Sequence, residues 1–300
     1  MDLRQLRYFV AVAESGSISM AAGRLHVAQS AVSRQMRRLE DEIGGDLFKR
    51  SVSGVTLTDS GQMLLERARF ILREVESAAG DVSSFSREVH GTVRMAAPAS
   101  VGRAVYAPTA LQFCRRYPRV KLELREIPTD EVLQRLSAGL LDLGIVSDSG
   151  VYDHLTVTPL MREHTVLCCP QGSLLANCGR VVAADLERLP IIISAGLRRI
   201  FVRRFGELHH VIQIDGVGTA LQLALAGIGY AVMPRSTAST ADSVNGLVPI
   251  PIDGFSIDRS LAVATSRPAS LATRVFRSVI EEQVERCIEA GLFTAITPSR

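Results

Sequence analysis

Aromatic residues and cysteines are scarce in this 300-residue chain, and tryptophan is absent. Aromatic residues make up 5% of the sequence, which argues against a protein that stacks single-stranded nucleic acid on aromatic side chains. The cysteines are odd in number and no two are separated by two residues: Cys114, Cys168, Cys169, Cys178 and Cys287. This pattern disfavours a disulfide framework and a structural zinc site, and it favours a reducing compartment.

Long apolar runs are missing as well. No uncharged apolar stretch reaches the length of a membrane span. Residues 1–9 carry charges where a signal peptide has an apolar core. We therefore predict a soluble, cytoplasmic protein without a membrane partner.

Motifs for catalysis or cofactor binding are not found either. The chain has no G-x-S-x-G elbow, no P-loop and no H-E-x-x-H sequence. Residues 216–221 begin like a dinucleotide-binding motif, but Leu221 stands where the third small residue belongs. We predict no enzymatic activity, no cofactor and no metal. The alternative is an enzyme or small-molecule-binding protein with an appended helix-turn-helix head, which an assay of turnover would distinguish.

Positive charge is concentrated near the start of the chain, although the net charge is only +3. The length predicts roughly two domains, and a hydrophobic content of 47% is sufficient for buried cores. Residues 21–39 contain no acidic side chain but four arginines: Arg24, Arg34, Arg37 and Arg38. Such a stretch indicates either a surface that faces phosphates or a solvated helix face.

Apolar spacing within residues 2–57 predicts three helices followed by a hairpin. Gly16 ends the first helix and Ser17 is a suitable cap for the second. The third runs over about residues 29–43, and one of its faces is apolar: Val32, Met36, Leu39 and Ile43. Its opposite face carries Ser30, Ser33, Arg34 and Arg37, as a helix that enters a DNA groove requires.

A long helix is predicted over residues 58–87. Its apolar residues recur at alternating spacings of four and three: Leu64, Ala68, Ile71, Val75, Ala78, Val82 and Phe85. This is the seam of a two-stranded coiled coil, and we favour a dimer because the opposite face is charged and a single long helix has no neighbour of its own. The alternative is a helix that lies on its own domain.

Beyond a predicted hinge at residues 89–91, strands alternate with helices. We expect strands at residues 93–96, 120–127, 141–146, 165–168, 191–194, 211–214, 230–233 and 261–265. Helices fit at about residues 101–116, 130–138, 183–188, 197–207, 217–227 and 269–289. This alternation predicts α/β layers with largely parallel sheets.

Residues 6–61 carry a family resemblance. The matching motifs stand in order: Leu6-Arg7-Tyr8-Phe9-Val10, Gly16-Ser17-Ile18, Ala21-Ala22, Leu25-His26-Val27, Gln29-Ser30-Ala31-Val32-Ser33, Leu39-Glu40, Leu47-Phe48-Lys49-Arg50, Thr56-Leu57-Thr58 and Gly61. The chain closely resembles the LysR-type transcriptional regulators, and among them the members related to nitrogen-assimilation regulators. The resemblance implies an N-terminal winged helix-turn-helix, a dimerising linker helix and an effector-binding domain of two α/β subdomains similar to periplasmic binding proteins.

The resemblance also implies domain limits. We expect a DNA-binding domain at residues 1–58, a linker helix at 59–88 and an effector-binding domain at 92–300. One subdomain is predicted to hold residues 92–162 and 266–300, and the other residues 163–265.

Candidate DNA contacts follow from the third helix and the wing. Arg pairs with guanine, Gln with adenine and Ser with several base edges, while basic wing residues reach phosphate or the minor groove. The candidates are Gln29, Ser30, Ser33, Arg34, Arg37, Arg38 and Arg50. The chain departs from many family members at Ala28, where Ser or Thr usually caps the helix, and at Ser30, where Pro is common.

A small organic effector is implied between the two subdomains, and helix amino ends at the cleft favour an anion. The candidate contacts are Ser100, Val101, Thr129, Ser194 and Gly218. Simple helix capping is the alternative role for Ser100 and Thr129. The implied partners are double-stranded DNA with an interrupted dyad, the effector, further copies of the chain in a homodimer or homotetramer, and RNA polymerase.

Overall fold

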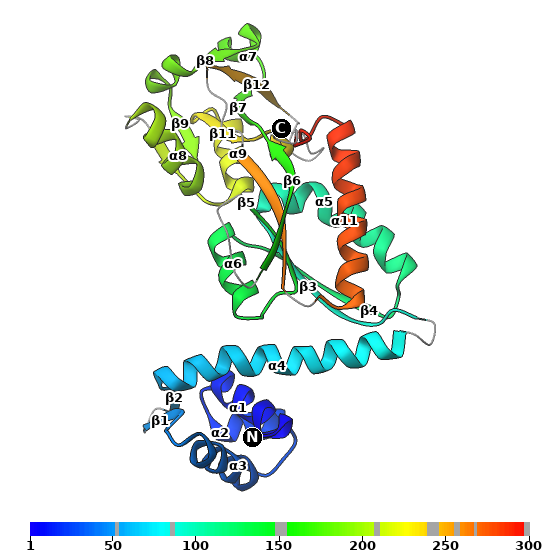
Figure 1. The fold of residues 1–300 in the computed structure, drawn as a ribbon. Helices are drawn as coiled ribbons and strands as arrows, with labels where there is room; N and C mark the ends of the chain where they lie inside the picture. Colours follow the sequence, from blue (N-terminus) through cyan, green and yellow to red (C-terminus); the bar gives the residue numbers. More distant parts are fainter. Residues whose placement is uncertain are drawn as a thin grey trace.

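A computed structural model describes residues 1–51, 54–84, 88–147, 155–206, 211–238, 246–254, 259–266 and 269–296. Figure 1 shows a small N-terminal domain, a long helix that runs across it, and a larger domain with two sheets.

The N-terminal domain is a winged helix-turn-helix, as predicted. Its elements are α1 (Leu3–Ser15), α2 (Ile18–Arg24), α3 (Gln29–Ile43), β1 (Phe48–Ser51) and β2 (Gly54–Leu57). Asp2 and Gln5 form a capping box at the start of α1, and Gly16 ends this helix in the left-handed conformation. The helices enclose one core around Phe9 and Met36, and β1 pairs with β2 in an antiparallel hairpin.

The long helix α4 (Asp59–Ser84) packs against α1. Leu65 and Ala68 are buried in the core of the N-terminal domain, and Leu64 and Ile71 pack against it. The expectation that this helix has no neighbour within its own chain is therefore wrong for its first half. An amphipathic helix buries its apolar face wherever a complementary apolar surface lies close, and α1 provides one.

The first subdomain contains a five-stranded sheet in the order β4-β3-β5-β13-β6. Its strands are β3 (Gly91–Ala97), β4 (Val120–Glu126), β5 (Leu143–Ser147), β6 (Leu155–Glu163) and β13 (Arg259–Ser266). Helices α5 (Ala99–Arg116) and α11 (Leu271–Glu289) cover one face, where the rings of Phe113 and Phe276 meet edge to face at 4.8 Å. Helix α6 (Thr129–Ser137) covers the other face.

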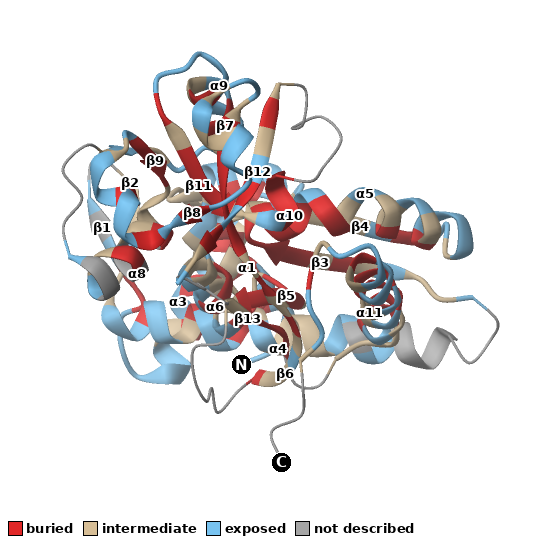
Figure 2. Ribbon diagram, turned by 90° about the horizontal axis from the view of Figure 1, so that it is seen from above, coloured by how far each residue is buried: buried red, intermediate tan, exposed pale blue. Residues whose placement is uncertain are grey.

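The second subdomain contains a six-stranded sheet in the order β10-β9-β11-β7-β12-β8. The strands are β7 (Thr165–Pro170), β8 (Val181–Val182), β9 (Ile191–Ile193), β10 (Val211–Gln213), β11 (Tyr230–Pro234) and β12 (Leu247–Asp253). Its helices are α7 (Leu174–Cys178), the 3-10 helix η1 (Ala183–Arg188), α8 (Ala195–Phe205), α9 (Val217–Leu225) and α10 (Arg235–Ala238). Both sheets have buried strands, while the outer faces of several helices are exposed (Figure 2).

The chain crosses between the subdomains twice, after Glu163 and again between β12 and β13. Strand β13 lies in the first sheet, between β5 and β6, so the predicted boundary at residues 265–266 is wrong for this strand. The sheets are mixed rather than largely parallel. Because β6 leaves the first subdomain and β13 returns to it, these adjacent strands run antiparallel, and β7 is likewise antiparallel to β11 and β12.

The predicted hinge also differs in detail. Gly91 is the first residue of β3, where it pairs with Val120, so residue 91 belongs to the sheet.

Candidate nucleic-acid interface and small-molecule site

Helix α3 presents a polar and basic face to solvent. Val32, Met36 and Leu39 are fully buried and anchor the helix on α1 and α2. Among the predicted DNA contacts, Ser33 is half-buried and the following are exposed: Gln29, Ser30, Arg34, Arg37 and Arg38. Within the described part of the chain these three arginines have no ion-pair partner. Their charge is therefore available to an external anion.

A tight turn sets the angle between α2 and α3. His26 adopts a left-handed conformation with φ of 54°, its N–H donates to the Gly23 carbonyl, and the Val27 N–H donates to the Ala22 carbonyl. At the start of α3, Ala28 occupies the capping position and makes no side-chain hydrogen bond to the helix. The departure noted in the sequence thus leaves first-turn N–H groups of α3 without a protein cap.

The wing is fixed to both α1 and α3. The Glu40 Oε1 atom on α3 accepts hydrogen bonds from the backbone N–H groups of Leu47 and Phe48 at 3.0 and 3.2 Å. The Val55 N–H donates to the Gly16 carbonyl at 2.8 Å, and a Cβ on Gly54 would lie 2.8 Å from the same oxygen. Arg50 lies on strand β1 within this wing, and its side chain is outside the description.

Helix α4 keeps apolar residues on its surface beyond the part that packs on α1. Of the predicted dimer seam, Leu64, Ala68 and Ile71 contact the N-terminal core, whereas Val75 and Ala78 are exposed. Exposed apolar side chains also include Met63 and Phe70. The side chain of Val82 and the whole of Phe85 lie outside the described residues.

Ser100, the first predicted effector contact, lies in a buried polar network at the junction of the subdomains. Its side-chain Oγ accepts a hydrogen bond from Arg259 Nη2 at 2.8 Å and donates one to Glu163 Oε2 at 3.3 Å. The single hydroxyl proton of Ser236 is within reach of two acceptors, Glu163 Oε1 and the Ser100 carbonyl. Ser100 is 5% exposed and does not cap α5, whose capping residue is Pro98.

This network joins four segments of the chain. Glu163 and Arg259 are cross-strand partners at the ends of β6 and β13 where the chain crosses, and they form an ion pair. Ser100 belongs to α5 of the first subdomain, and Ser236 belongs to α10 of the second. Only Ser236 lies in the second subdomain, so a change in the angle between the subdomains would alter its contacts to Glu163 and Ser100. Sequence reasoning missed Glu163, Arg259 and Ser236, because no local pattern connects residues so far apart in the chain.

The other predicted effector contacts have different surroundings. Thr129 Oγ1 accepts a hydrogen bond from the Ser147 N–H at 3.1 Å and so ties the start of α6 to the end of β5. Ser194 caps α8 through the Leu197 N–H, and Gly218 is exposed near the start of α9. Val101 is fully buried in the first core, and its N–H donates to the Pro98 carbonyl. Because its side chain is enclosed by the core and its N–H is already bonded, Val101 offers no group that a ligand could contact here.

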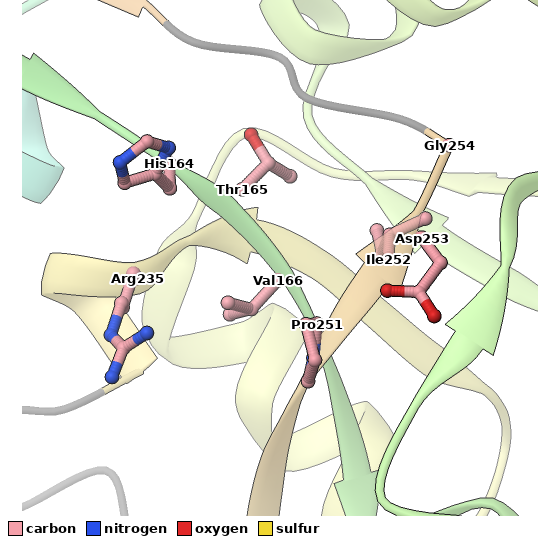
Figure 3. A pocket seen from close by; sticks show the side chains of 8 residues that line it. All are labelled: His164, Thr165, Val166, Arg235, Pro251, Ile252, Asp253 and Gly254. Atoms are coloured by element: carbon pink, nitrogen blue, oxygen red, sulfur yellow. The ribbon is translucent and has the colours of Figure 1, made fainter.

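A cavity of about 400 Å³ opens beside the crossing, on the second subdomain. It is lined by His164, Thr165, Val166, Arg235 and residues 251–254, and Figure 3 shows the nitrogen-bearing side chains of His164 and Arg235 on one side of it. None of the predicted effector contacts lines this cavity. It is adjacent to the polar network, because Glu163 precedes His164 and Ser236 follows Arg235.

The His, Cys, Asp and Glu side chains bear on metal binding and on thiol reactivity. In the described ranges, no three His, Cys, Asp or Glu side chains lie close enough to hold a metal ion. No described helix is both long and apolar enough to cross a membrane. Cys168 and Cys169 are buried in β7, and burial raises the pKa of each thiol to about 12. Cys114 and Cys178 are exposed.

Comparison with known proteins gives matches to both parts of the chain. Residues 3–62 match the family described as bacterial regulatory helix-turn-helix protein, lysR family, and residues 86–285 match the LysR substrate binding domain. The nitrogen assimilation regulatory protein nac of Klebsiella aerogenes is 29% identical over 95% of this chain and 96% of its own length.

Solved structures share the architecture. A full-length variant of OxyR from Pseudomonas aeruginosa matches over 99% of each chain with a TM-score of 0.80 and 22% sequence identity. Full-length CbnR in a complex with its target DNA matches over 95% of this chain and 100% of its own, with a TM-score of 0.56 and 23% identity. At these identities the likeness establishes the fold, which is the predicted arrangement of a winged helix-turn-helix, a linker helix and a two-subdomain α/β domain.

Proposed function

The chain belongs to the LysR family of transcriptional regulators, and we propose that it reads its operator through the exposed face of α3. The observation that carries the proposal is the row of exposed arginines along this face, which have no ion-pair partner among the described residues, on a helix that is anchored by three buried apolar residues. Gln29 and Ser30 stand at the amino end of α3, where recognition helices approach base edges, and Arg34 follows one turn later. Arg37, Arg38 and wing residue Arg50 are suited to phosphates.

The exposed second half of α4 is proposed as the contact with a second copy of the chain. Val75 and Ala78 continue the apolar seam beyond the point where α1 covers it, and Val82 and Phe85 extend the same spacing. Pairing there would place two α3 helices for half-sites about one helical turn, ~34 Å, apart. Assembly into tetramers would then hold a longer promoter stretch and alter the access of RNA polymerase.

For the effector we propose a small organic anion that binds between the two subdomains. The support is the direction of α5 and α6, whose amino ends carry Ser100 and Thr129 and have the partial positive charge that favours anions. Ser100 is covered by Arg259, so ligand entry would require the network of Ser100, Glu163, Ser236 and Arg259 to rearrange. To regulate, the effector must bind one assembly shape more tightly than the other.

The place of action follows from the partner. A regulator of transcription works where DNA and RNA polymerase are, which we propose is the cytoplasm. Catalytic turnover is not part of the proposal, and an assay on metabolites that bind would test this directly, because a sensor releases its ligand unchanged.

Selection from a random DNA library tests the main proposal. The purified full chain is used for selection, and the enriched sites are measured again across a salt series. Enrichment of an interrupted dyad with steep salt dependence supports a dimeric reader. Weak, uniform binding without enrichment would overturn it and direct attention to the enzyme or binding-protein alternative.

A further inference from the structure

Helix α4 contacts the first subdomain as well as the N-terminal domain (Figure 1). We infer that Arg73 is the positioning residue that fixes α4 on this subdomain. We infer further that α6 connects the residues around the Arg73 side chain, called its seat below, to the proposed effector site. The second half of the inference rests on the proposed function, because it takes the amino end of α6 as part of the effector site.

The Arg73 side chain lies in a seat made by the turn after α6 and the two residues that precede β5. Nη1 donates to the Leu141 carbonyl at 3.3 Å and lies 3.8 Å from Asp142 Oδ1. Nε donates to the Arg69 carbonyl at 3.3 Å on its own helix, which holds the side chain in this direction. Arg73 and Asp142 are 17% and 16% exposed, so the contact is largely shielded from solvent.

The seat exists because residue 139 is glycine. Gly139 has φ of 69°, in the left-handed region that disfavours a side chain. A Cβ at this position would lie 1.9 Å from Arg73 Nη2. Any other residue at 139 would displace the guanidinium, and lysine at 73 would lose the planar group that fills this space.

The electrostatics of the pair of Arg73 and Asp142 favour a role in orienting α4 over a role in stabilising the fold. Asp142 also accepts a hydrogen bond from the Arg94 N–H at 2.8 Å and lies 3.8 Å from Arg94 Nη1. Burial nevertheless raises the pKa of Asp142 and lowers the pKa of Arg73, so desolvation outweighs the attraction on both sides. A buried pair of this kind contributes little net stability, but it strongly disfavours arrangements in which one charge is left alone.

Helix α6 connects this seat to the candidate effector site. Thr129 begins the helix and is tied to the end of β5 through Ser147. Gly139 follows the other end of α6, where the Leu140 N–H donates to the Arg135 carbonyl at 2.7 Å. Val132 and Leu136 are buried against the sheet, so α6 moves as one rod about 14 Å long. A shift at Thr129 is thereby transmitted to Arg73 and to the helix that carries the DNA-binding domain.

The test measures the distance between the two domains directly. Spin labels are placed at Met20→Cys on α2 and Glu285→Cys on α11, both exposed positions, in a full chain with Cys114→Ser and Cys178→Ser. Labelled chains are diluted with unlabelled ones so that only distances within one chain are recorded. We expect a single narrow distribution for the parent and for the control Arg67→Ala, which removes an exposed arginine from the same helix.

Arg73→Ala, Arg73→Lys and Gly139→Ala are expected to broaden the distribution at least twofold. Arg73→Ala tests the inference without straining the turn, and far-ultraviolet circular dichroism verifies the fold of each variant. An unchanged distribution in Arg73→Ala would overturn the positioning role. Thr129→Val should broaden the distribution as well, with no further effect in combination with Arg73→Ala. Additive effects of these two changes would overturn transmission through α6.

The DNA library gives the separate test of the proposed function. If it yields no operator, the proposed function fails while the distance measurement still decides the role of Arg73. If it yields one, Arg73→Ala should bind it within about threefold of the parent affinity but bend it by a different angle. An unchanged bend angle would count against the inference.

Discussion

Arg259 Nη2 on β13 lies 2.8 Å from Ser100 Oγ on α5, two segments of the first subdomain that meet where the chain crosses, and Glu163 completes the contact. Because Glu163 is 1% exposed, its removal leaves the Arg259 charge without its carboxylate in a poorly solvated place. We expect Glu163→Ala to lower the free energy of unfolding by about 3 kcal/mol, at the low end for a buried pair because Arg259 is 21% exposed. Ser100→Ala removes hydrogen bonds to two charged groups but no charge, and it should cost about 2 kcal/mol.

Urea denaturation of the full chain measures both changes, with the exposed Glu285→Ala as the control for loss of a carboxylate. Equal losses for Glu163→Ala and Ser100→Ala would contradict a charged network centred on Glu163.

The same network shows which contacts a sequence pattern cannot predict. Ser100 is a candidate from the sequence because it follows a predicted strand, but its partners come from segments 63 and 159 residues away. Local periodicity carries no information about such contacts. In the N-terminal domain the residues that mark the helix ends are local signals. Gly16 and Gly44 follow helices and Ser17 precedes one, so the elements of this domain are predicted correctly.

Strands β6 and β12 are not predicted from the sequence because both contain proline. Strand β6 contains Pro159 and β12 contains Pro249 and Pro251, and proline normally argues against a strand. Pro159 lies next to a register shift on the edge strand of the first sheet, where the absence of a backbone N–H is tolerated. Without β6, the return of β13 into the first sheet could not be seen, and the second crossing was placed too late.

The missing cap of α3 gives a prediction about stability. Ala28→Ser supplies an oxygen that accepts a hydrogen bond from a first-turn N–H, and the backbone at this position is already extended. We expect the free energy of unfolding to rise by about 1 kcal/mol. Thermal denaturation measures it, and Ala79→Ser on the exposed surface of α4 is the control that adds a hydroxyl without a capping role. An equal change in the free energy of unfolding at both positions would mean that the missing cap does not limit the stability of α3.

Arg34 is expected to read a base. If it pairs with guanine, Arg34→Ala should cost about 1–3 kcal/mol on the selected operator and relax the preference at one base position. Fluorescence anisotropy on the operator and on single-base variants measures the loss, with Arg67→Ala on α4 as the control. A loss that is equal on every DNA sequence, with a shallower salt dependence, would assign Arg34 to phosphate instead.

Val75 separates dimerisation from folding. It is exposed in the single chain, at 36%, whereas Ala68 of the same seam is fully buried in the N-terminal core. Val75→Asp should therefore leave the fold intact and raise the dimer dissociation constant at least about tenfold, because the new charge would be buried between two helices. Sedimentation velocity measures the dimer, and Gln62→Asp adds the same charge at an exposed polar position. An unchanged profile in Val75→Asp would place the dimer contact elsewhere.

The cysteines should divide into reactive and inert groups. Only the thiolate reacts with alkylating agents or peroxide, and burial raises the pKa of Cys168 and Cys169 to about 12. A raised pKa means less thiolate at a given pH, so at pH 8 only about one in ten thousand of these thiols is ionised. Maleimide should label Cys114 and Cys178 rapidly in the native protein, and all five cysteines after denaturation. Mass spectrometry of peptides identifies the labelled sites. Rapid labelling of Cys168 or Cys169 in the native state would mean that β7 opens readily to solvent, and a redox role for this strand would then have to be considered.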